Sequence, residues 1–472
     1  MTVYDLIVIG GGTAGLVTAA GGAGLGARVA LVERERLGGE CLWTGCVPSK
    51  ALLACARAAS DARRAARFGV STGDVSADLL AALGWVREAQ RRVEPHDSPE
   101  RFRGLGVEVV EGEGRFLDAR TVAVDGRKLQ AKQVVIATGT RAAVPPIPGL
   151  DGVPYFTNES IFTLDRRPRA LLVLGAGPIG LELAQAFTRL GTPATVVELS
   201  PVLLPREDEE LAAVLGAALR ADGVDVRLGQ RVTSVRQAGG DVVLACEGAD
   251  GASREVRGDA LLVATGRRSN VETLALDRAG VATDAGDVVV DERLRTTARG
   301  VWAAGDVTGG LRFTHVADYE ARLVLRNALF PLAAKRDYSV VPWVTFTDPE
   351  LAHVGLTERE ARARHGGGVG VWRRPFADVD RAIADDETAG MVKLVTDARG
   401  RIVGGHIVGH GAGTMIAEVA LAMQQRLSVG QLAAAIHAYP TYPEAIRQAA
   451  ELRLKARFTG VAKRAAGWFA RR

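Results

Sequence analysis

Apolar residues in this chain occur in short runs that end in glycine-rich turns, and one such unit occurs twice. Residues 4–20 (YDLIVIGGGTAGLVTAA) begin with an apolar run, continue through a cluster of glycines and end in small residues. Residues 170–187 (ALLVLGAGPIGLELAQAF) follow the same order. An apolar run before glycines is typical of a buried strand, and the small and apolar residues after them are typical of a helix. We therefore predict two strand–turn–helix units.

Each unit continues into a second apolar segment that ends in an acidic residue, at Glu33 in 28–33 (RVALVE) and at Glu198 in 194–198 (ATVVE). A GxGxxG turn between a strand and a helix, followed by an acid about 20 residues later, is typical of dinucleotide binding. The glycines permit a tight turn and a close approach to a pyrophosphate, and the acid accepts hydrogen bonds from a ribose. The glycines concerned are Gly10, Gly12 and Gly15 in the first unit, and Gly175, Gly177 and Gly180 in the second.

Three further apolar runs, 134–140 (VVIATGT), 261–270 (LLVATGRRSN) and 300–310 (GVWAAGDVTGG), end in polar or glycine residues. Ligands of open α/β sheets bind beyond the carboxyl ends of the strands, so we expect these ends to complete the two nucleotide sites. Asp306 fits a hydrogen bond to a hydroxyl-rich linker such as a ribityl chain, and it fits a helix N-cap equally well. The other residues that we expect near the nucleotides are Thr138, Gly139, Gly266 and Ala317.

The chain changes character after about residue 340. Alternating segments at 342–350, 391–397 and 401–409 are followed by helical patterns, which predicts a separate α+β domain. Two prolines in 439–445 (YPTYPEA) predict a non-helical turn there. The glycines at 21–24 (GGAG), by contrast, lie in or just after the first helix, and the pattern gives them no role.

Composition narrows the functional classes. The 472 residues carry a net charge of +4, and no run of Lys and Arg with interleaved aromatics indicates nucleic-acid binding. No apolar run is long enough to span a membrane, and the N-terminus lacks the basic region of a signal peptide. Four cysteines do not make a disulfide framework, so we expect a reducing, cytoplasmic location.

Two of the four cysteines, Cys41 and Cys46, lie close together in 38–50 (GGECLWTGCVPSK). In a reducing compartment such a pair is typically catalytic, redox-sensing or metal-binding. A zinc site needs two more ligands, and Cys55 and Cys246 show no matching spacing, so we expect no metal. Two inert buried thiols remain as the other alternative.

Together these motifs resemble the class I pyridine nucleotide–disulfide oxidoreductases, a family that includes dihydrolipoamide dehydrogenase, glutathione reductase and mercuric reductase. The resemblance extends along the whole chain and includes 344–358 (VTFTDPELAHVGLTE). It implies an α/β fold with two Rossmann-like dinucleotide-binding domains, for FAD and NAD, and a C-terminal α+β dimerisation domain that forms a symmetric homodimer. The implied boundaries are 1–148 with 270–338 for FAD, 149–269 for NAD(P) and 339–472 for dimerisation.

The resemblance also implies roles for the motif residues. Cys41 and Cys46 would form a redox-active disulfide beside FAD, with Cys46 facing the flavin and Cys41 attacking the acceptor. Cys46 precedes Pro48, which suits the first turn of a helix, where a thiolate is stabilised. Lys50 and Glu182 match the ion pair near the flavin in this family. The alternative is that Lys50 is a surface lysine and Glu182 an acid on a helix face, with no role at the flavin.

The nicotinamide preference depends on Glu198. A carboxylate at that strand end favours the 2′-hydroxyl of NAD and repels the 2′-phosphate of NADP. No arginine occurs in 199–205 (LSPVLLP), so we expect NAD(H), with NADP(H) as the less favoured cofactor.

The chain departs from the family pattern near its C-terminus. Disulfide-reducing members carry a His–Pro pair whose histidine is the acid–base group, and here Tyr439 precedes Pro440, with Glu444 in the place of the family's carboxylate. A phenol with a pKa near 10 is a poor base at neutral pH. His437 lies two residues earlier, and it substitutes only if the backbone differs, so a structural role is favoured.

We therefore expect an FAD-dependent oxidoreductase that passes electrons from NADH through FAD and the Cys41–Cys46 pair to a small disulfide or another thiol-reactive acceptor. One alternative is direct reduction of quinones, dyes or oxygen by the flavin, or transhydrogenation. Another is metal-ion reduction as in mercuric reductases, although the C-terminal cysteine pair of those enzymes is absent here. A redox-sensing or subunit-binding protein is the least favoured alternative, because binding alone needs neither Lys50 nor Glu182.

Overall fold

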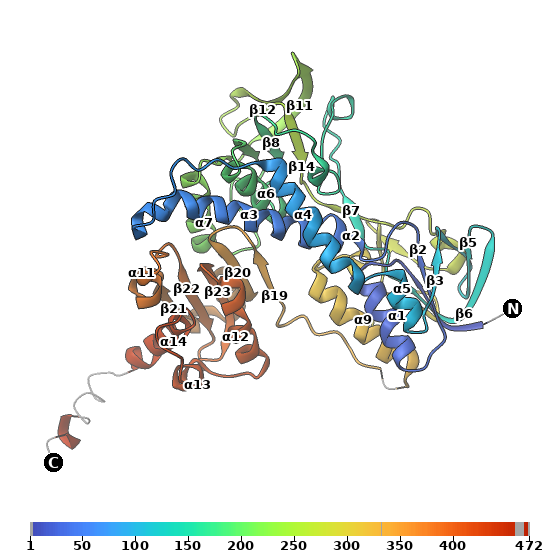
Figure 1. The fold of residues 1–472 in the computed structure, drawn as a ribbon. Helices are drawn as coiled ribbons and strands as arrows, with labels where there is room; N and C mark the ends of the chain where they lie inside the picture. Colours follow the sequence, from blue (N-terminus) through green and yellow to red (C-terminus); the bar gives the residue numbers. More distant parts are fainter. Residues whose placement is uncertain (1–2, 332, 458–466, 471–472) are drawn as a thin grey trace.

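The computed structural model describes residues 3–331, 333–457 and 467–470. The chain forms an N-terminal unit, a middle unit and a C-terminal unit, each with sheets of its own (Figure 1). This α/β architecture, with two Rossmann-like units and a C-terminal α+β unit, confirms the predicted fold class. The domain boundaries stay predictions, and residues 458–466 and 471–472 of the expected third domain lie outside the described residues.

The N-terminal unit is built on a sheet in the order β3-β2-β1-β6-β5-β4, and β18 also pairs with β6. The pairs that join β3, β2, β1, β6 and β18 are parallel, as expected for strands buried on both faces. Because β18 comes from residues 301–303, the chain returns to this sheet after the middle unit. The strands are β1 (Val3–Ile9), β2 (Val29–Glu33), β3 (Glu108–Glu111), β4 (Gly114–Asp118), β5 (Thr121–Val124), β6 (Arg127–Ile136) and β18 (Val301–Ala303).

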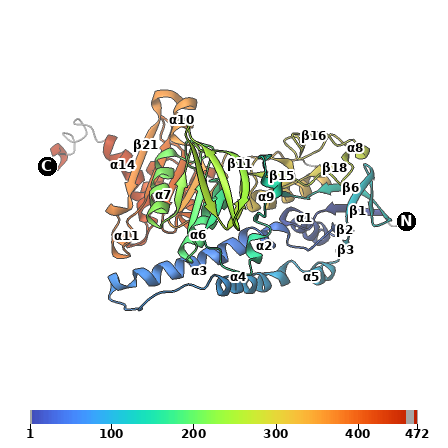
Figure 2. The ribbon, with the colours of Figure 1, turned by 90° about the horizontal axis from the view of Figure 1, so that it is seen from above.

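Helices cover the faces of this sheet, and α3 and α4 lie side by side along one long edge of the molecule (Figure 2). An antiparallel ribbon of β7 (Thr140–Ala142) and β15 (Arg267–Ser269) joins the unit to the middle of the chain, and β16 (Thr283–Asp284) pairs with β17 (Asp287–Val288). The helices are α1 (Thr13–Gly24), α2 (Gly39–Trp43), α3 (Cys46–Arg64), α4 (Leu79–Val93), α5 (Pro99–Gly104), α8 (Leu276–Ala279) and α9 (Thr314–Leu329).

The glycines at 21–24 belong to α1, and the fold gives two of them a role. A Cβ added at Gly21 would lie 2.4 Å from a methyl group of Leu325 on α9. One added at Gly22 would lie 3.0 Å from Val29 at the start of β2. These glycines therefore let α1 pack closely against α9 and the sheet, a contact that the local sequence pattern does not predict.

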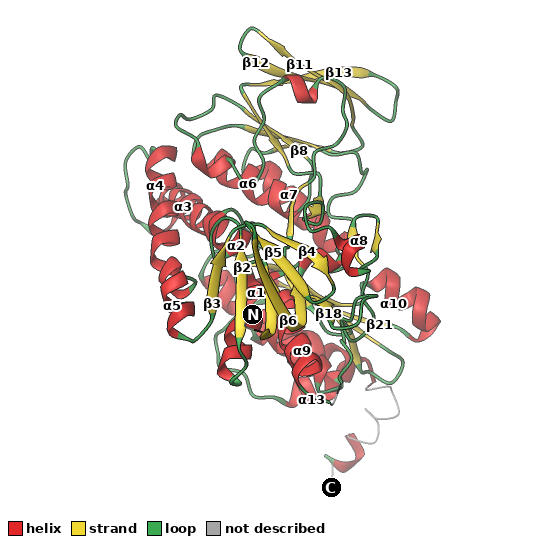
Figure 3. Cartoon of the chain, turned by 90° about the vertical axis from the view of Figure 1, so that its right-hand side faces the viewer, coloured by secondary structure: helices red, strands yellow, loops and turns green. Residues whose placement is uncertain are grey.

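The middle unit repeats the strand–turn–helix plan in a smaller parallel sheet with the order β10-β9-β8-β14. Three antiparallel strands, β11, β12 and β13, form a second sheet that projects from the rest of the molecule (Figure 3). The elements are β8 (Leu171–Leu174), α6 (Pro178–Arg189), β9 (Ala194–Val197), α7 (Glu209–Ala221), β10 (Asp225–Arg227), β11 (Arg231–Ala238), β12 (Asp241–Glu247), β13 (Ser253–Gly258) and β14 (Ala260–Val263).

The C-terminal unit has a five-stranded antiparallel sheet in the order β19-β20-β23-β22-β21. The segment 435–443 between its last two helices is non-helical, where the two prolines predicted a turn. The elements are β19 (Pro342–Thr345), β20 (Glu350–Gly355), α10 (Glu358–His365), β21 (Gly370–Pro375), α11 (Asp380–Ala384), β22 (Met391–Thr396), β23 (Ile402–Gly409), α12 (Ala412–Gln424), α13 (Val429–Ala434) and α14 (Glu444–Arg457). Within the described ranges, no helix is both long and apolar enough to cross a membrane.

Candidate active site

The two glycine-rich turns have backbone shapes that exclude other residues. Gly10 and Gly175 have φ angles of 110° and 104°, a region that side chains rarely adopt. A Cβ on them would lie 2.3 Å from the carbonyl oxygen of Ala137 and 2.6 Å from that of Ala264. The third glycines, Gly15 and Gly180, pack equally closely, because a Cβ there would lie 1.7 Å and 2.2 Å from the carbonyl oxygens of Gly10 and Gly175.

The two strand-end acids bind their own glycine turns. Glu33 accepts a hydrogen bond of 2.6 Å from the backbone N–H of Gly11. Glu198 accepts equivalent bonds of 2.7 Å from the N–H of Ala176 and of Ser200. The two sequence repeats therefore produce two copies of one local site, each with a carboxylate at the end of its strand.

Both sites fit the phosphate groups of a dinucleotide. The helices α1 and α6 begin after Gly12 and Gly177, which provide no side-chain cap for the first N–H groups of the helix. A Cβ at Gly177 would meet no atom within 4 Å, so the space over this helix end is open. Open N–H groups at the positive end of a helix dipole suit an anionic pyrophosphate, and the donor set thus fits FAD and a nicotinamide dinucleotide.

Asp306 does not act as a helix N-cap. It is the first residue of a short 3₁₀ helix (Asp306–Thr308), and Gly305 occupies the cap position. Its carboxylate accepts a 3.0 Å hydrogen bond from Thr140 Oγ1, and burial raises its pKa. Ala317 packs against Gly305, with a distance of 3.3 Å to an added Cβ.

The remaining strand-end residues form the loops between the two nucleotide sites. Thr138 Oγ1 donates a 2.7 Å hydrogen bond to the carbonyl oxygen of Asn270. Gly139 and Gly266 have φ angles of 63° and 144°, so both turns need glycine. The contact with Asn270 joins a strand end of the N-terminal unit to the segment through which the chain returns from the middle unit.

The cysteine pair lies where two short turns of chain meet. Cys41 is in α2 and is half-buried, whereas Cys46 is the first residue of α3 and is exposed. The Cys46 sulfur lies 3.3 Å from the hydroxyl oxygen of Thr314, which is the first residue of α9. Cys46 therefore lies at the N-terminus of one helix and contacts the N-terminal residue of another, where helix dipoles favour a negative charge.

The pKa values of the two thiols move in opposite directions. The Cys41 thiol donates a hydrogen bond to the Cys46 sulfur, and this bond is the main cause that lowers the pKa of Cys46 to about 6. Thr314 and the ammonium group of Lys50 lower it further, whereas burial and Glu182 oppose them. The same hydrogen bond, helped by burial, raises the pKa of Cys41. Both shifts favour a thiolate at Cys46 and a thiol at Cys41.

Lys50 and Glu182 form an ion pair between units. The Lys50 ammonium donates a 2.9 Å hydrogen bond to Glu182, whose side chain is 4% exposed. The other oxygen of this carboxylate accepts a 2.9 Å bond from the backbone N–H of Phe346 in the C-terminal unit. The Phe346 ring also lies 4.4 Å from the ammonium nitrogen. Lys50 and Glu182 are therefore paired with each other, and their role beside a flavin stays a prediction.

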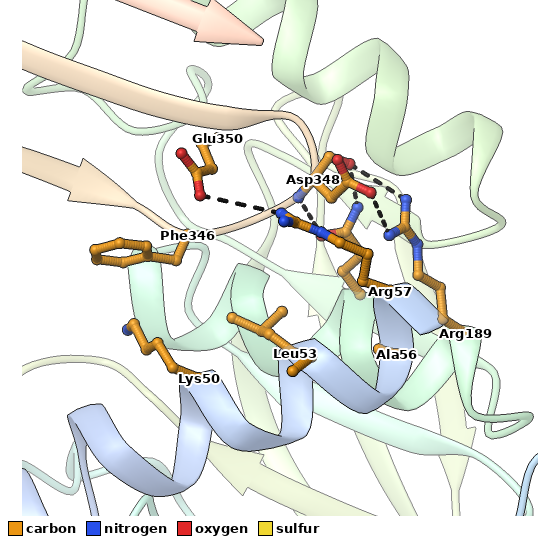
Figure 4. A pocket seen from close by; sticks show the side chains of 10 residues that line it. Lys50, Leu53, Ala56, Arg57, Arg189, Phe346, Asp348 and Glu350 are labelled. Atoms are coloured by element: carbon orange, nitrogen blue, oxygen red, sulfur yellow. Dashed lines mark hydrogen bonds and ion pairs between the residues drawn. The ribbon is translucent and has the colours of Figure 1, made fainter. Parts of the chain in front are cut away.

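A cavity of about 140 Å³ lies beside Lys50, between all three units (Figure 4). Lys50, Leu53 and Arg57 line it from successive turns of α3. Arg57 has a loose ion pair of 4.0 Å with Glu350 at the start of β20. The cavity therefore continues the ion-pair site along α3, away from Cys46.

Within one chain, the C-terminal candidates Tyr439, His437 and Glu444 form hydrogen bonds with residues other than the two cysteines. The Tyr439 hydroxyl donates a 2.8 Å hydrogen bond to Asp380, which raises the pKa of the phenol. His437 lies 2.8 Å from a carboxylate oxygen of Glu418, so it has a structural partner. Glu444 accepts a 2.9 Å bond from Arg447. The carboxylate partner of Tyr439 is thus Asp380, and no hydrogen bond joins Tyr439 to Glu444.

Three contacts at the site were missed by sequence reasoning. Thr314 is 268 positions from Cys46 in the chain, so no local signal relates the two. Glu40, inside the cysteine motif, forms an ion pair with Arg267 of β15. Asp380 precedes Tyr439 by 59 residues. Only Glu40 and Arg267, which lie within the motifs 38–50 and 261–270, could have been considered from the sequence.

No group of three or more His, Cys, Asp or Glu side chains that could hold a metal ion occurs in the part of the chain that the structure describes. The cysteine pair therefore has no zinc ligands around it there. Cys246 is buried and Cys55 half-buried, away from the pair.

Comparisons with known proteins agree with this geometry. Residues 4–321 match the family model of the pyridine nucleotide-disulphide oxidoreductases, and residues 341–450 match the dimerisation domain of the same family. A solved structure, the Cu(II) complex of the HOCl-induced flavoprotein disulfide reductase RclA from Escherichia coli, superimposes with a TM-score of 0.84 at 30% identity. It covers 96% of this chain and 100% of RclA.

Two curated relatives have similar identity over almost their whole length. The mercuric reductase of Streptomyces lividans is 37% identical over 460 residues, which is 95% of this chain and 96% of that protein. The dihydrolipoyl dehydrogenase of Thermus scotoductus is 37% identical over 462 residues, or 96% and 97%. Family proteins use FAD and a nicotinamide dinucleotide, which the two repeated sites fit. The chain belongs to the pyridine nucleotide-disulphide oxidoreductase family and is a flavoprotein oxidoreductase with a dimerisation domain.

Proposed function

We propose that this protein oxidises NADH and passes the electrons through FAD to a Cys41–Cys46 disulfide, which then reduces a disulfide or another thiol-reactive acceptor. The observation that carries this proposal is the position of Cys46, which begins α3, follows Cys41 of the preceding helix α2 and has its sulfur 3.3 Å from the Thr314 hydroxyl. The opposite directions of the two pKa shifts agree with it. In the balanced half-reaction, NADH, one proton and the disulfide give NAD⁺ and two thiols. The second half-reaction returns the pair to the disulfide and releases the reduced acceptor.

In this proposal, Lys50 and Glu182 act near the flavin, and the cysteine pair acts on the acceptor. The glycine turn of the N-terminal unit would hold FAD, which would supply two-electron transfer between the nicotinamide and the cysteine pair. Lys50 on α3 forms an ion pair with Glu182 on α6. The backbone N–H of Phe346 donates a hydrogen bond to the other carboxylate oxygen of Glu182. Cys41 would be the thiol that attacks the acceptor, and its hydrogen bond to Cys46 and its burial raise its pKa.

We infer a preference for NADH over NADPH. The carboxylate of Glu198 is fixed at the end of β9 by two backbone N–H groups, where it favours a ribose 2′-hydroxyl and repels a 2′-phosphate. The expected result is a higher kcat/KM with NADH than with NADPH, by about tenfold or more. Equal or reversed values would show that Glu198 does not set the preference.

The acceptor proposal follows from Tyr439. Asp380 raises the pKa of this phenol, so it remains protonated at neutral pH and is a poor general base. We therefore propose an electrophilic acceptor that reacts with Cys41 without a strong base. We also propose a homodimer in which Tyr439, which is 69% exposed in one chain, serves the partner's site.

Thiol-binding metal ions form a second candidate class of acceptor. The relatives include mercuric reductases, and an RclA structure is described as a Cu(II) complex. Two neighbouring sulfur atoms suit such ions. Direct reduction of quinones, dyes or oxygen by the flavin is a different class, because it does not need the cysteine pair.

An anaerobic titration of the purified yellow protein with NADH tests the proposal. The expected result is a long-wavelength absorbance band, because the two-electron-reduced protein holds the Cys46 thiolate against oxidised flavin. Cys41→Ser should abolish acceptor reduction, whereas the matched variant Cys55→Ser should not. Simple bleaching of the flavin, with full turnover in Cys41→Ser, would instead identify a direct flavin reductase.

A further inference from the structure

A row of five side chains crosses the C-terminal sheet next to the active site. Trp343 on β19 pairs across the strands with His353 on β20, and His353 pairs with His406 on β23. His406 pairs with Lys393 on β22, which in turn pairs with Arg373 on β21. Because cross-strand neighbours point to the same side, the row lies on one face of the sheet.

Acidic residues just before α7 in the middle unit bind this row. Glu207 accepts a 2.6 Å hydrogen bond from Trp343 Nε1, and its other oxygen lies 3.3 Å from Nδ1 of His353. The Lys393 ammonium, with 3% of its side chain exposed, lies 2.8 Å from a carboxylate oxygen of Asp208. The Glu207 and His353 side chains are only 4% and 2% exposed. The row is thus a buried polar seam between the middle and C-terminal units.

The end of the seam at Trp343 extends to the redox centre. The Trp343 ring stacks on His353 with centroids 3.8 Å apart, and it also stacks on Phe313 at 5.8 Å. Phe313 is the N-cap residue of α9 and stacks on His315 at 5.3 Å. Thr314 lies between these two rings in the chain, and its hydroxyl is 3.3 Å from the Cys46 sulfur.

We propose that Trp343, held by Glu207 and His353, is a positioning residue that fixes the start of α9 and thereby keeps the Thr314 hydroxyl on the Cys46 sulfur. Trp343 does not touch the sulfur, so it acts only through Phe313 and Thr314. The seam then has two roles, because it joins the middle unit to the C-terminal sheet and also stabilises the thiolate. This inference rests on the proposed function of Cys46 as the thiolate that faces the flavin.

The long-wavelength band of the NADH-reduced holoenzyme reports the ionisation of Cys46, so its titration with pH tests the inference. The groups that face this sulfur are Cys41, Thr314, Lys50 and Glu182, and all are unchanged in Trp343→Ala. Thr314→Val, which removes the hydroxyl directly, should move the midpoint upward by about one pH unit, since a hydrogen bond to a charged group changes an equilibrium by on the order of tenfold.

Trp343→Ala should move the midpoint upward in the same direction and by most of that amount. The double variant Trp343→Ala with Thr314→Val should show no further shift, because both changes remove the same hydrogen bond. Additive shifts would overturn the inference, since Trp343 would then act on Cys46 by a separate route.

The matched control is Trp372→Ala. Trp372 is also a tryptophan of the C-terminal sheet with a side-chain hydrogen bond, to Thr396, but it lies on β21 at the opposite edge of the sheet from β19. This variant should leave the midpoint unchanged. Phe313→Leu keeps an apolar side chain but removes the aromatic stack, and it should raise the midpoint even if Trp343→Ala does not fold.

The outcomes separate the inference from the proposed function. A normal band whose midpoint is raised by Thr314→Val, but not by Trp343→Ala or Phe313→Leu, would overturn the inference alone. An equal shift in Trp372→Ala would also overturn it, because the effect would then be general loosening of the sheet. A wild-type protein without any long-wavelength band would overturn both.

Discussion

At the scale of single residues, Cys46 gains its low pKa from several weak effects that reinforce one another. The first residue of a helix has an open N–H group and the positive end of the helix dipole. The Cys41 thiol and the Thr314 hydroxyl add hydrogen bonds, and Lys50 adds a positive charge. Hydrogen bonds to a charged group are stronger than those between neutral groups, so both donors favour the thiolate form of Cys46.

Lys50→Met should slow reduction of the flavin by NADH by at least about tenfold. The change leaves the Glu182 carboxylate buried without its cation and removes a charge beside Cys46. Anaerobic stopped-flow absorbance measures the rate. The control, Lys132→Met, removes a 69% exposed lysine that pairs with Asp5, and it should reduce at the wild-type rate. Unchanged kinetics in Lys50→Met would exclude a role for the ion pair in hydride transfer.

At the scale of elements, the two strand–turn–helix repeats reach the same local geometry with different helix partners. Both turns need glycine at the positions of positive φ and at the closest approach of helix to strand. Only α1 carries extra glycines, because α9 packs across it at Leu325. A repeat that looks equivalent in sequence thus differs in its tertiary contacts.

Gly21→Ala should lower the thermal unfolding midpoint, although alanine is the better helix former. The new methyl group would lie 2.4 Å from Leu325, and such overpacking costs about 1–3 kcal/mol. Gly24→Ala is the matched control, since a Cβ there meets no atom within 4 Å, and it should be neutral or slightly stabilising. Leu325→Ala in the Gly21→Ala background should restore part of the loss. Equal midpoints for the two glycine variants would contradict this packing.

At the scale of the whole molecule, the candidate active site lies where the three units meet. Cys46 and Lys50 come from the N-terminal unit, Glu182 from the middle unit, and the N–H that fixes Glu182 from Phe346 of the C-terminal unit. Ion pairs between the units hold this arrangement. The best buried of them surrounds Lys393, which lies 2.8–2.9 Å from Asp208, Glu210 and Glu358.

Lys393→Met should destabilise the contact between the middle and C-terminal units by about 3–5 kcal/mol, because the buried carboxylate of Asp208 loses its cation. Glu210 and Glu358 are more exposed and keep their ion pairs with Arg373. Differential scanning calorimetry should show a lower midpoint or a separate early transition. Lys335→Met removes a lysine that is 60% exposed and pairs with Glu292, and it should shift the midpoint very little. A wild-type melting curve for Lys393→Met would mean that the cluster contributes no net stability.

Ile436→Asp should weaken the proposed homodimer. Ile436 is 99% exposed in one chain and lies in the matched dimerisation domain, so an apolar contact with a second copy explains its exposure. Sedimentation velocity at low micromolar concentration should detect monomers. Leu25→Asp, at a 56% exposed leucine of the N-terminal unit, should remain dimeric. An unchanged dimer in Ile436→Asp would place the interface elsewhere.

The sequence by itself determined the fold class, the family and the two glycine turns. Strand and helix periodicity and positive φ are local properties, so a short stretch of residues is enough to specify them. The motif 38–50 likewise fixed the candidate redox cysteines without any knowledge of what surrounds them.

Only the tertiary structure decided the partners of these residues. Thr314 meets Cys46 across 268 positions, Trp343 meets Glu207 across 136, and Tyr439 binds Asp380 rather than Glu444. Such contacts depend on how whole units pack, and packing sums many weak interactions that no local pattern encodes. For the same reason, His437 could be placed two residues from Tyr439 by sequence, but only the fold paired it with Glu418.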